Sequence, residues 1–474
     1  MTAPAASVLI FGLPPQPHTP AASTQANSPW ATLLTIVMCP YPSPIRVLTE
    51  SAPLFGRSKP IILESAKGAI TIRDLRRFLR FFLVRRFEDV QNYIMNSRER
   101  ILTVLRGGIP DRVPVAPFIQ EEYLAWVYPG RQNLDRVDTV LELARELPFD
   151  VITKHNRFMI PPFMLRDHLN WRVRRETARE GEMWITRVEI TTPDRTLTQE
   201  SVKPDAGAAT QGLMSAMRKH LLETPDDIAA FIRWLPELDA QEIRSMRETA
   251  AGWRARVGDR GINAPWGWAG VFNYASDLWG IENLMMAPYT DETLYAALMD
   301  TLTRHMIACN APLIEGGADA IGLQGHIANG RSVSPDYFME HVFPYEKRLI
   351  DAIHGQGAYT VYHNCGCAHA FYGCYRELGM TVWETVAEAP QGDNTLAEAK
   401  AVMGDRVCLL GNLDQLRFLK TATPAEVDAK AREIVRIGKP GGRYLFAASD
   451  FLEKNTPAEN VRAMLRAATE EGGY

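Results

Sequence analysis

A histidine and two cysteines occur within five residues in the segment "VYHNCGC", which runs from Val361 to Cys367. His363 and Cys365 are two positions apart and directly follow an apolar run. Side chains two apart on an extended chain point the same way, so an imidazole nitrogen and a thiolate can bind one ion, and zinc accepts both ligands. Such an ion stabilises a thiolate or polarises an oxygen atom at neutral pH. The spacing therefore predicts a metal site, and thiols packed in an ordinary core are the competing interpretation.

Short apolar runs that predict strands position this segment. After Met95 these runs alternate with longer helical patterns, which is typical of a parallel sheet, and about eight such units predict a closed α/β barrel of the TIM (β/α)8 kind. One segment, Trp184 to Glu200, instead alternates over two runs around Pro193 and Asp194, and predicts a small β-hairpin inserted beside the barrel. The predicted strands are Val113–Pro117, Asp150–Thr153, Gly261–Pro265, Ala320–Leu323, Ala358–His363, Thr381–Thr385, Val407–Gly411 and Arg443–Ala447.

Several helix starts carry capping residues. Thr224, Thr423 and Thr456 each stand before a proline, which predicts a capping hydroxyl followed by proline in the first turn. Glu426 and Glu459 would complete capping boxes. Ser334 opens a further helix in the same way, and that helix is expected to end near Gly355.

The barrel prediction selects the candidate site residues, because catalytic groups of such barrels gather at the carboxyl ends of the strands. Polar side chains end five consecutive predicted strands, and we expect them to converge on one mouth. For one of them, His326, a packed histidine bonded to backbone is the competing interpretation. These strand-end residues are Gln324, His326, His363, Cys365, Glu384, Asn412 and Asp450.

Composition and charge limit the kinds of partner. The hydrophobic fraction of 46% and charged fraction of 23% are those of a globular protein with a core. A formal net charge of -4 gives no basic face for phosphates, so we expect no nucleic acid partner. Six cysteines are few for 474 residues and three crowd one place, which argues against a disulfide framework and favours a cytoplasmic location.

The first 94 residues differ from the rest in composition and pattern. Residues 1–60 are rich in Pro, Ala, Ser and Thr, and their longest apolar run, Trp30 to Cys39, is too short to span a bilayer. We expect no membrane span and no signal peptide, and a basic amphipathic helix is a weaker possibility over residues 73–87. Residues 1–94 are therefore predicted to be an extension that is poorly ordered or reflects a mis-assigned start. The folded domain is expected over residues 95–474, with Asn96 or Ser97 capping its first helix.

From about Met95 to Tyr474 the chain resembles the uroporphyrinogen decarboxylase (URO-D) superfamily. The phrases that carry the resemblance are "NSRERILTVLRGGIPDRVPV", "GGADAIGLQGHIANGRSVSPDYFMEHVFPYEKRLIDAIHGQG", "GNLDQ" and "TPAENVRAM". The resemblance implies a TIM barrel of the UROD/MetE-like type. It is less specific for the reaction, because one fold hosts several chemistries.

Two branches of this superfamily predict different reactions. True uroporphyrinogen decarboxylases carry an arginine-rich phrase near the start, whose cations hold the carboxylates of the substrate. The corresponding stretch here is "VAPFIQEEYLAWVYPG", which has no arginine and places Glu121 and Glu122 there instead. Losing bidentate arginine contacts removes the main source of affinity for a polycarboxylate, so this branch is disfavoured.

The chain resembles more closely the cobamide-dependent methyltransferases, which bind zinc through a His-x-Cys pair and a further cysteine near the last strand. His363 and Cys365 match the pair, and the expected third cysteine falls near Asp450. A carboxylate can bind zinc, but it is a harder ligand than a thiolate and opens the site to other metals. Cys367 and Glu384 are further candidates for the third ligand.

The resemblance implies a metal-dependent methyltransferase. It would move a methyl group between a small-molecule donor or acceptor and a methylcobamide carried on a separate corrinoid protein, and dimers are expected by analogy. A decarboxylase acting on a small carboxylate, and a barrel that binds a ligand without catalysis, are the alternatives. In this interpretation His363, Cys365 and Asp450 bind the metal, and catalytic roles in substrate orientation or proton relay fall to Glu384, His326, Gln324 and Asn412. The aromatic residues that would line the substrate pocket, or else pack in the core, are Trp266, Trp268, Phe272 and Tyr274.

Overall fold

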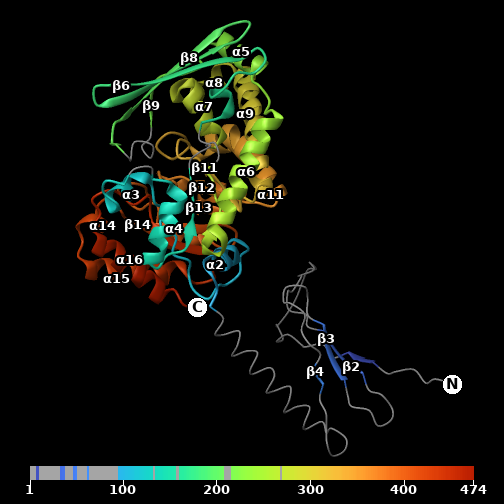
Figure 1. Cartoon of the computed structure of the whole chain (residues 1–474), viewed down its shortest axis with the longest axis vertical. Helices are drawn as coiled ribbons and strands as arrows, with labels where there is room; N and C mark the ends of the chain where they lie inside the picture. The colour runs from blue at the N-terminus through green and yellow to red at the C-terminus, as the bar shows by residue number, and fades with distance from the viewer. Residues whose placement is uncertain are drawn as a thin grey trace, which may run out of the picture. The chain divides into compact units, whose positions relative to one another are not determined.

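The computed structural model describes residues 94–131, 134–155, 160–207, 215–266 and 270–474, together with four short strands nearer the N-terminus (Figure 1). The chain divides into two compact units, Met1–Tyr93 and Ile94–Tyr474. In the first unit, strands β1 (Ser7–Leu9), β2 (Leu33–Val37), β3 (Arg46–Glu50) and β4 (Ile61–Ile62) pair antiparallel in that order. The helix predicted over residues 73–87 lies outside the described residues.

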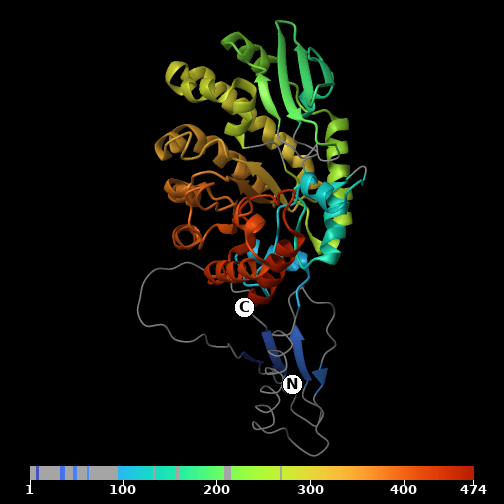
Figure 2. The same ribbon diagram turned by 90° about the vertical axis from the view of Figure 1, so that its left-hand side faces the viewer.

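The second unit has an α/β fold in which parallel strands alternate with helices (Figure 2). Its largest sheet has the order β11-β12-β13-β14-β15, and every pair in it is parallel. The strands are β11 (Ala320–Gln324), β12 (Tyr359–His363), β13 (Val382–Glu384), β14 (Cys408–Leu413) and β15 (Tyr444–Ala448).

Two further short strands, β5 (Val151–Ile152) and β10 (Gly261–Ile262), pair parallel with each other. Single parallel bridges join Val115 to Phe446 and Trp266 to Gly322. Seven of the eight predicted strands are thus present as strands. The predicted strand Val113–Pro117 is present only as the bridge at Val115, because its prolines lack the amide N–H that a longer ladder needs.

A separate four-stranded antiparallel sheet has the order β6-β7-β8-β9 and lies at the top of Figure 1. Its strands are β6 (Arg172–Glu180), β7 (Met183–Thr191), β8 (Thr196–Pro204) and β9 (Ala216–Lys219). The segment in which we expected a hairpin falls on β7 and β8, which pair antiparallel from Met183–Pro204 to Thr191–Thr196. The alternating sequence belongs to a wider sheet, whose two outer strands we did not predict.

Several helices begin where a capping side chain accepts hydrogen bonds from free amide groups. The predicted caps Asn96, Thr224 and Thr423 each form a capping box. The prediction for Thr456 is wrong: its hydroxyl donates to the Glu453 carbonyl, and the last helix starts at Ala458 without a side-chain cap. The longer helices of the unit are α2 (Ser97–Leu105), α3 (Glu121–Val127), α4 (Arg136–Glu146), α5 (Pro225–Trp234), α6 (Ala240–Val257), α7 (Val271–Trp279), α8 (Ile281–Thr290), α9 (Glu292–Glu315), α11 (Phe343–Gly355), α12 (Tyr372–Leu378), α13 (Leu396–Met403), α15 (Pro424–Gly438) and α16 (Ala458–Glu471).

Short helical turns complete the chain path. Ser334 accepts a hydrogen bond from the Tyr337 amide, so the predicted cap is confirmed, and the helix that follows ends at Gly355 as expected. Among the described residues, no helix is both long and apolar enough to cross a bilayer. These turns are η1 (Pro162–Met164), η3 (Gly258–Arg260), α10 (Pro335–Tyr337), η4 (Phe338–Val342), η5 (His369–Phe371) and α14 (Phe418–Thr421).

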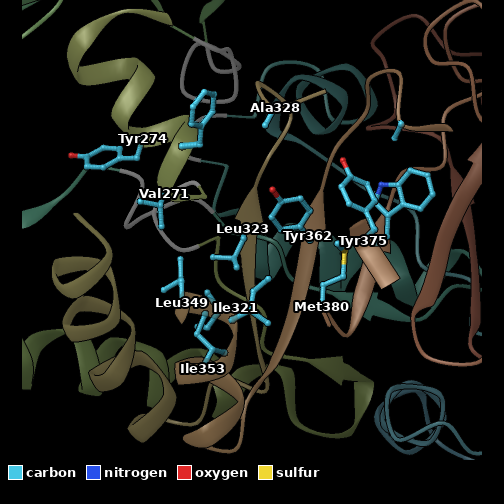
Figure 3. Packing of buried hydrophobic residues seen from close by; sticks show 14 of the residues in the cluster. Val271, Tyr274, Ile321, Leu323, Ala328, Leu349, Ile353, Tyr362, Tyr375 and Met380 are labelled. Carbon is cyan, nitrogen blue, oxygen red and sulfur yellow. The ribbon is translucent and has the colours of Figure 1, made fainter. Parts of the chain in front are cut away.

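The hydrophobic core has two parts because successive strand residues face opposite sides. Val361, Val382 and Leu410 belong to a smaller cluster of buried side chains that includes Ile101 and Val104 of α2. The intervening strand residues belong to the larger cluster against the covering helices. Figure 3 shows part of it, with Ile321 and Leu323 of β11 beside Leu349 and Ile353 of α11. The smaller cluster marks the inner face of the parallel strands.

Candidate metal centre

The polar residues at the strand ends continue the inner face of the sheet. Val361 and Val382 lie on that face, so His363 and Glu384, each two residues further on, point the same way. The strand registers pair His363 with Gln324 on one side and with Glu384 on the other. The alternation of the strands therefore brings these three residues to neighbouring positions at the carboxyl edge.

Asn364 fixes the backbone between His363 and Cys365. Its side chain is fully buried and donates to the carbonyls of Gly325 (3.1 Å) and Ala328 (3.2 Å). Its own carbonyl accepts from the indole of Trp383 at 3.2 Å. Because Asn364 is anchored on the side away from its two neighbours, the imidazole and the thiol are left to face a common space.

His363, Cys365 and Asp450 form a group of potential metal ligands. One ligand atom from each lies within 4.8 Å of the others. Asp450 follows β15, and its Oδ2 is 3.8 Å from Nε2 of His363. Zinc bonds of about 2.0 to 2.3 Å place tetrahedral ligand atoms roughly 3.3 to 3.8 Å apart. The three side chains therefore fit a zinc ion after at most a small adjustment, and Cys367 and Glu384 lie outside this group.

Glu384 instead contacts Nδ1 of His363. Its Oε2 lies 3.2 Å from Nδ1 of His363, and its Oε1 accepts from the ammonium group of Lys154. The Glu384 and Lys154 side chains are each 3% exposed, so the pair is buried. A carboxylate on one imidazole nitrogen orients the ring and presents the other nitrogen to a metal. Glu384 thus contacts the ring nitrogen of His363 opposite the one that faces Asp450.

The electrostatics of the group favour a cation. Burial would lower the pKa of His363, but Asp450, Cys365 and Glu384 outweigh it and hold the pKa well above its ordinary value. Burial raises the pKa of Asp450, and His363 opposes that rise. Burial would also raise the pKa of Glu384, but Lys154 and His363 bring it to about 2. The imidazole is thus surrounded by groups that stabilise positive charge, which a divalent ion would supply.

Of the other predicted catalytic residues, Gln324 pairs with His363 in the strand register, and His326 has a ring contact with it. The His326 ring is 6.3 Å from that of His363, and a nitrogen of His326 lies 3.2 Å from the amide nitrogen of Asn273. Burial, with a smaller contribution from His363, lowers the pKa of His326 to about 4. The backbone carbonyl of Gln324 accepts from the Gly270 amide at 2.6 Å. Asn412 is buried and donates to Glu388 at 2.9 Å, and no hydrogen bond between described residues joins it to His363.

Aromatic rings cover the imidazole on one side. Trp266 packs edge-on against His363 with ring centroids 5.7 Å apart. Two further residues of the predicted pocket, Phe272 and Tyr274, are buried on α7, where their rings pack against other buried aromatic rings. A substrate role for these two stays a prediction. Trp268 of the same set lies outside the described residues.

Two residues of this site were missed in the sequence. Lys154 directly follows the predicted strand that starts at Asp150, so its strand-end position was an available signal. Its φ of 42° is in the left-handed region, which is uncommon for a residue with a side chain. Phe118 follows the strand before it, and its ring lies 4.3 Å from Nζ of Lys154 and 6.1 Å from the His363 ring. Both contacts join residues far apart in the chain, so no local pattern predicts them.

Comparison with known proteins relates this site to a family. The family model described as uroporphyrinogen decarboxylase (URO-D) matches residues 214–471, which is more than half of the chain. This range contains His363, Cys365, Glu384 and Asp450.

The curated relatives include both branches of the superfamily. A methylcobamide:CoM methyltransferase, MtaA of Methanosarcina barkeri, is 28% identical over 207 residues, which are 43% of this chain and 57% of that protein. A uroporphyrinogen decarboxylase of Geobacter metallireducens is 26% identical over 230 residues, 47% of this chain and 62% of that protein. The chain thus spans about half the length of the curated relatives it matches.

Among solved structures, a methyltransferase from Methanosarcina mazei is similar with a TM-score of 0.56 at 19% identity. The match covers 79% of this chain and 99% of that one. At this identity the likeness concerns the fold alone.

Proposed function

The chain belongs to the uroporphyrinogen decarboxylase family, and from that membership we propose that it is a corrinoid-linked methyltransferase with a zinc site formed by His363, Cys365 and Asp450. It moves a methyl group between a small molecule and a methylcobamide held by a separate corrinoid protein. The observation that carries the proposal is the convergence of the three ligand atoms at the carboxyl edge, with Glu384 on the far nitrogen of His363. A decarboxylase needs no such ligand set.

We extend this assignment to the domain and the barrel. The active unit is residues 95–474, and residues 1–94 are an extension. The parallel strands close into a (β/α)8 barrel with β6–β9 inserted beside it. Support for closure comes from the two single bridges at Val115 and Trp266 and from the hydrogen bond between the Asp150 amide and the Val115 carbonyl.

Each residue of the site has its own role in this proposal. Zinc held there would lower the pKa of a bound thiol or polarise a bound oxygen. Glu384 accepts a hydrogen bond from Nδ1 of His363 and thereby keeps Nε2 free as a ligand atom. Lys154 neutralises Glu384 in a buried place. Phe118 and Trp266 cover His363 and exclude water from its face.

The residues beside the metal ligands complete the proposal. His326, with its pKa lowered to about 4, is neutral at pH 7 and can accept a hydrogen bond from a substrate. Gln324 and Asn412 are assigned to substrate orientation. These assignments rest on their strand-end positions next to His363 and in β14.

Methyl transfer to or from free methylcobalamin tests the proposal. Zinc-loaded full-length protein is mixed with methylcobalamin and coenzyme M, the acceptor in the names of several relatives, or with cob(I)alamin and methyl thioethers or methoxyarenes. The visible spectrum of the corrinoid reports transfer. We expect turnover in one direction that is lost in His363→Ala and Cys365→Ser.

A matched cysteine variant controls for the loss of a thiol as such. Cys374→Ser lies on α12, outside the ligand group, and should keep its turnover. No turnover of the wild type in either direction would overturn the proposal. So would decarboxylation of uroporphyrinogen that persists in Cys365→Ser, because that reaction needs no metal ligand at this position.

A further inference from the structure

A second group of ligand side chains lies apart from the strand-end site. His168 stands in the segment that leads into β6, and Asp239 and Glu242 stand at the start of α6. One ligand atom from each lies within 4.8 Å of the others. Nothing in the proposed methyl transfer uses these residues.

The start of α6 holds both carboxylates in fixed positions. Oδ1 of Asp239 accepts from the amides of Gln241 and Glu242, each at 2.8 Å. Oε2 of Glu242 accepts from the Asp239 amide, also at 2.8 Å, which completes a capping box. One oxygen of each carboxylate is thus used by the helix. The other oxygens, Oδ2 and Oε1, remain for a different partner.

Two buried atoms of the group lack a hydrogen bond. Oε1 of Glu242 and Nε2 of His168 have no hydrogen-bond partner among the described residues. Their side chains are 6% and 10% exposed, and the two atoms lie 3.3 Å apart. Buried polar atoms are nearly always satisfied, and an unseen ion is one standard explanation when they are not. A divalent cation would accept a lone pair from both.

Arg166 is the cation that now faces the carboxylates. Its guanidinium donates to Oδ2 of Asp239, and its Nε lies 3.7 Å from Oε1 of Glu242. The Arg166 side chain is 39% exposed, so it can turn into solvent without leaving a cavity. Arg166 therefore competes with a metal for the same oxygens.

We propose that His168, Asp239 and Glu242 form a second divalent-cation site, which binds zinc when Arg166 turns away. One imidazole and two carboxylates are ligands that zinc accepts, at distances of about 2.0 to 2.2 Å. The ion ties the segment before β6 to the first turn of α6. It thereby holds the start of the antiparallel sheet β6–β9 against helix α6, which is a structural role.

The test uses full-length protein in which the first site has been removed by His363→Ala and Cys365→Ser. This protein is stripped with a chelator and titrated with zinc, and the bound metal is measured by elemental analysis. We expect one zinc per chain to remain. Adding Glu242→Gln, which keeps the capping interaction, or His168→Gln should abolish that zinc, whereas Glu248→Gln on an exposed part of the same helix should not.

The competition with Arg166 gives a result in the opposite direction. Arg166→Gln should bind zinc more tightly. Zinc should also raise Tm of the His363→Ala, Cys365→Ser protein, but it should not raise Tm of the protein that carries Glu242→Gln as well. A direct contact between His168 and Glu242 without a metal is the competing arrangement. Absence of zinc in the first-site variant, or zinc that survives both Glu242→Gln and His168→Gln, would overturn the second site.

Discussion

Replacing Glu384 by glutamine separates its two contacts. The carboxylate accepts from Lys154 and lies 3.2 Å from Nδ1 of His363, and all three side chains are buried. Glutamine keeps the size of the side chain but removes its charge. The ammonium group of Lys154 then has no buried counter-charge, and the imidazole loses the group that orients it.

The expected magnitudes differ for the two contacts. Loss of the hydrogen-bonded partner of a metal-binding histidine typically weakens metal affinity about 10- to 100-fold, which is about 1.4 to 2.7 kcal/mol. Breaking a buried ion pair by removing one partner costs about 3 to 5 kcal/mol of folding stability. Glu384→Gln should therefore weaken zinc binding about 10- to 100-fold. It should also lower the folding stability of the metal-free protein by about 3 to 5 kcal/mol.

A second substitution tells the two effects apart. Lys154→Met in the Glu384→Gln background removes the unpaired charge, so it should restore most of the stability without restoring zinc affinity. Stability is measured by urea denaturation of metal-free protein, and affinity by competition with a chelator. Zinc affinity equal to wild type in Glu384→Gln, or recovery of affinity in the double variant, would refute the positioning role of Glu384.

Three further predictions concern single residues. Asp450→Cys replaces a hard ligand by a soft thiolate and should tighten zinc binding in the same chelator competition; weaker binding would contradict a ligand role at this position. Burial raises the pKa of Glu346 to about 8 from 4.5, so the folded state binds its proton more tightly and the free energy of unfolding should fall as pH rises between these values. Glu346→Gln should remove that slope in urea denaturation measured below, within and above this range, and an unchanged slope would contradict the assignment. Thr423→Ala removes the cap of α15 and should lower stability by about 1 kcal/mol, and an unchanged urea midpoint would argue against the capping box.

The local features of the fold could be predicted from the sequence. Apolar runs with beta-branched residues located the strands, and threonine before proline located the starts of α5 and α15. The same pattern failed at Thr456 because the last helix begins one residue later than expected, at Ala458, which puts Pro457 and not Thr456 in the cap position. The pattern fixes which residues can cap, and the surrounding backbone decides whether they do.

The candidate site could be predicted only in part. His363 and Cys365 are two residues apart on one strand, so their common direction follows from the geometry of the chain. The contact between Lys154 and Glu384 joins residues 230 positions apart, and it depends on the order and register of the strands. Likewise, no pattern in the sequence could assign Glu384 to Nδ1 of His363 and Asp450 to the side of Nε2.

The group around His168 shows the same limit. Arg166 and His168 stand about seventy residues before Asp239 and Glu242, and only the folded chain brings them together. The capping box at the start of α6 is visible in the sequence as Asp239 followed by Glu242. No pattern in the sequence indicates that His168 faces the remaining oxygens of these two carboxylates.

Zinc X-ray absorption on wild-type protein and on Cys365→Ser tests the central claim most directly, because it identifies the atoms bound to the metal. The account predicts bound zinc with a sulfur neighbour at about 2.3 Å in wild type and no sulfur neighbour in Cys365→Ser. Zinc bound only through nitrogen and oxygen in the wild type, or no bound zinc, would contradict the claim that His363 and Cys365 form a metal centre.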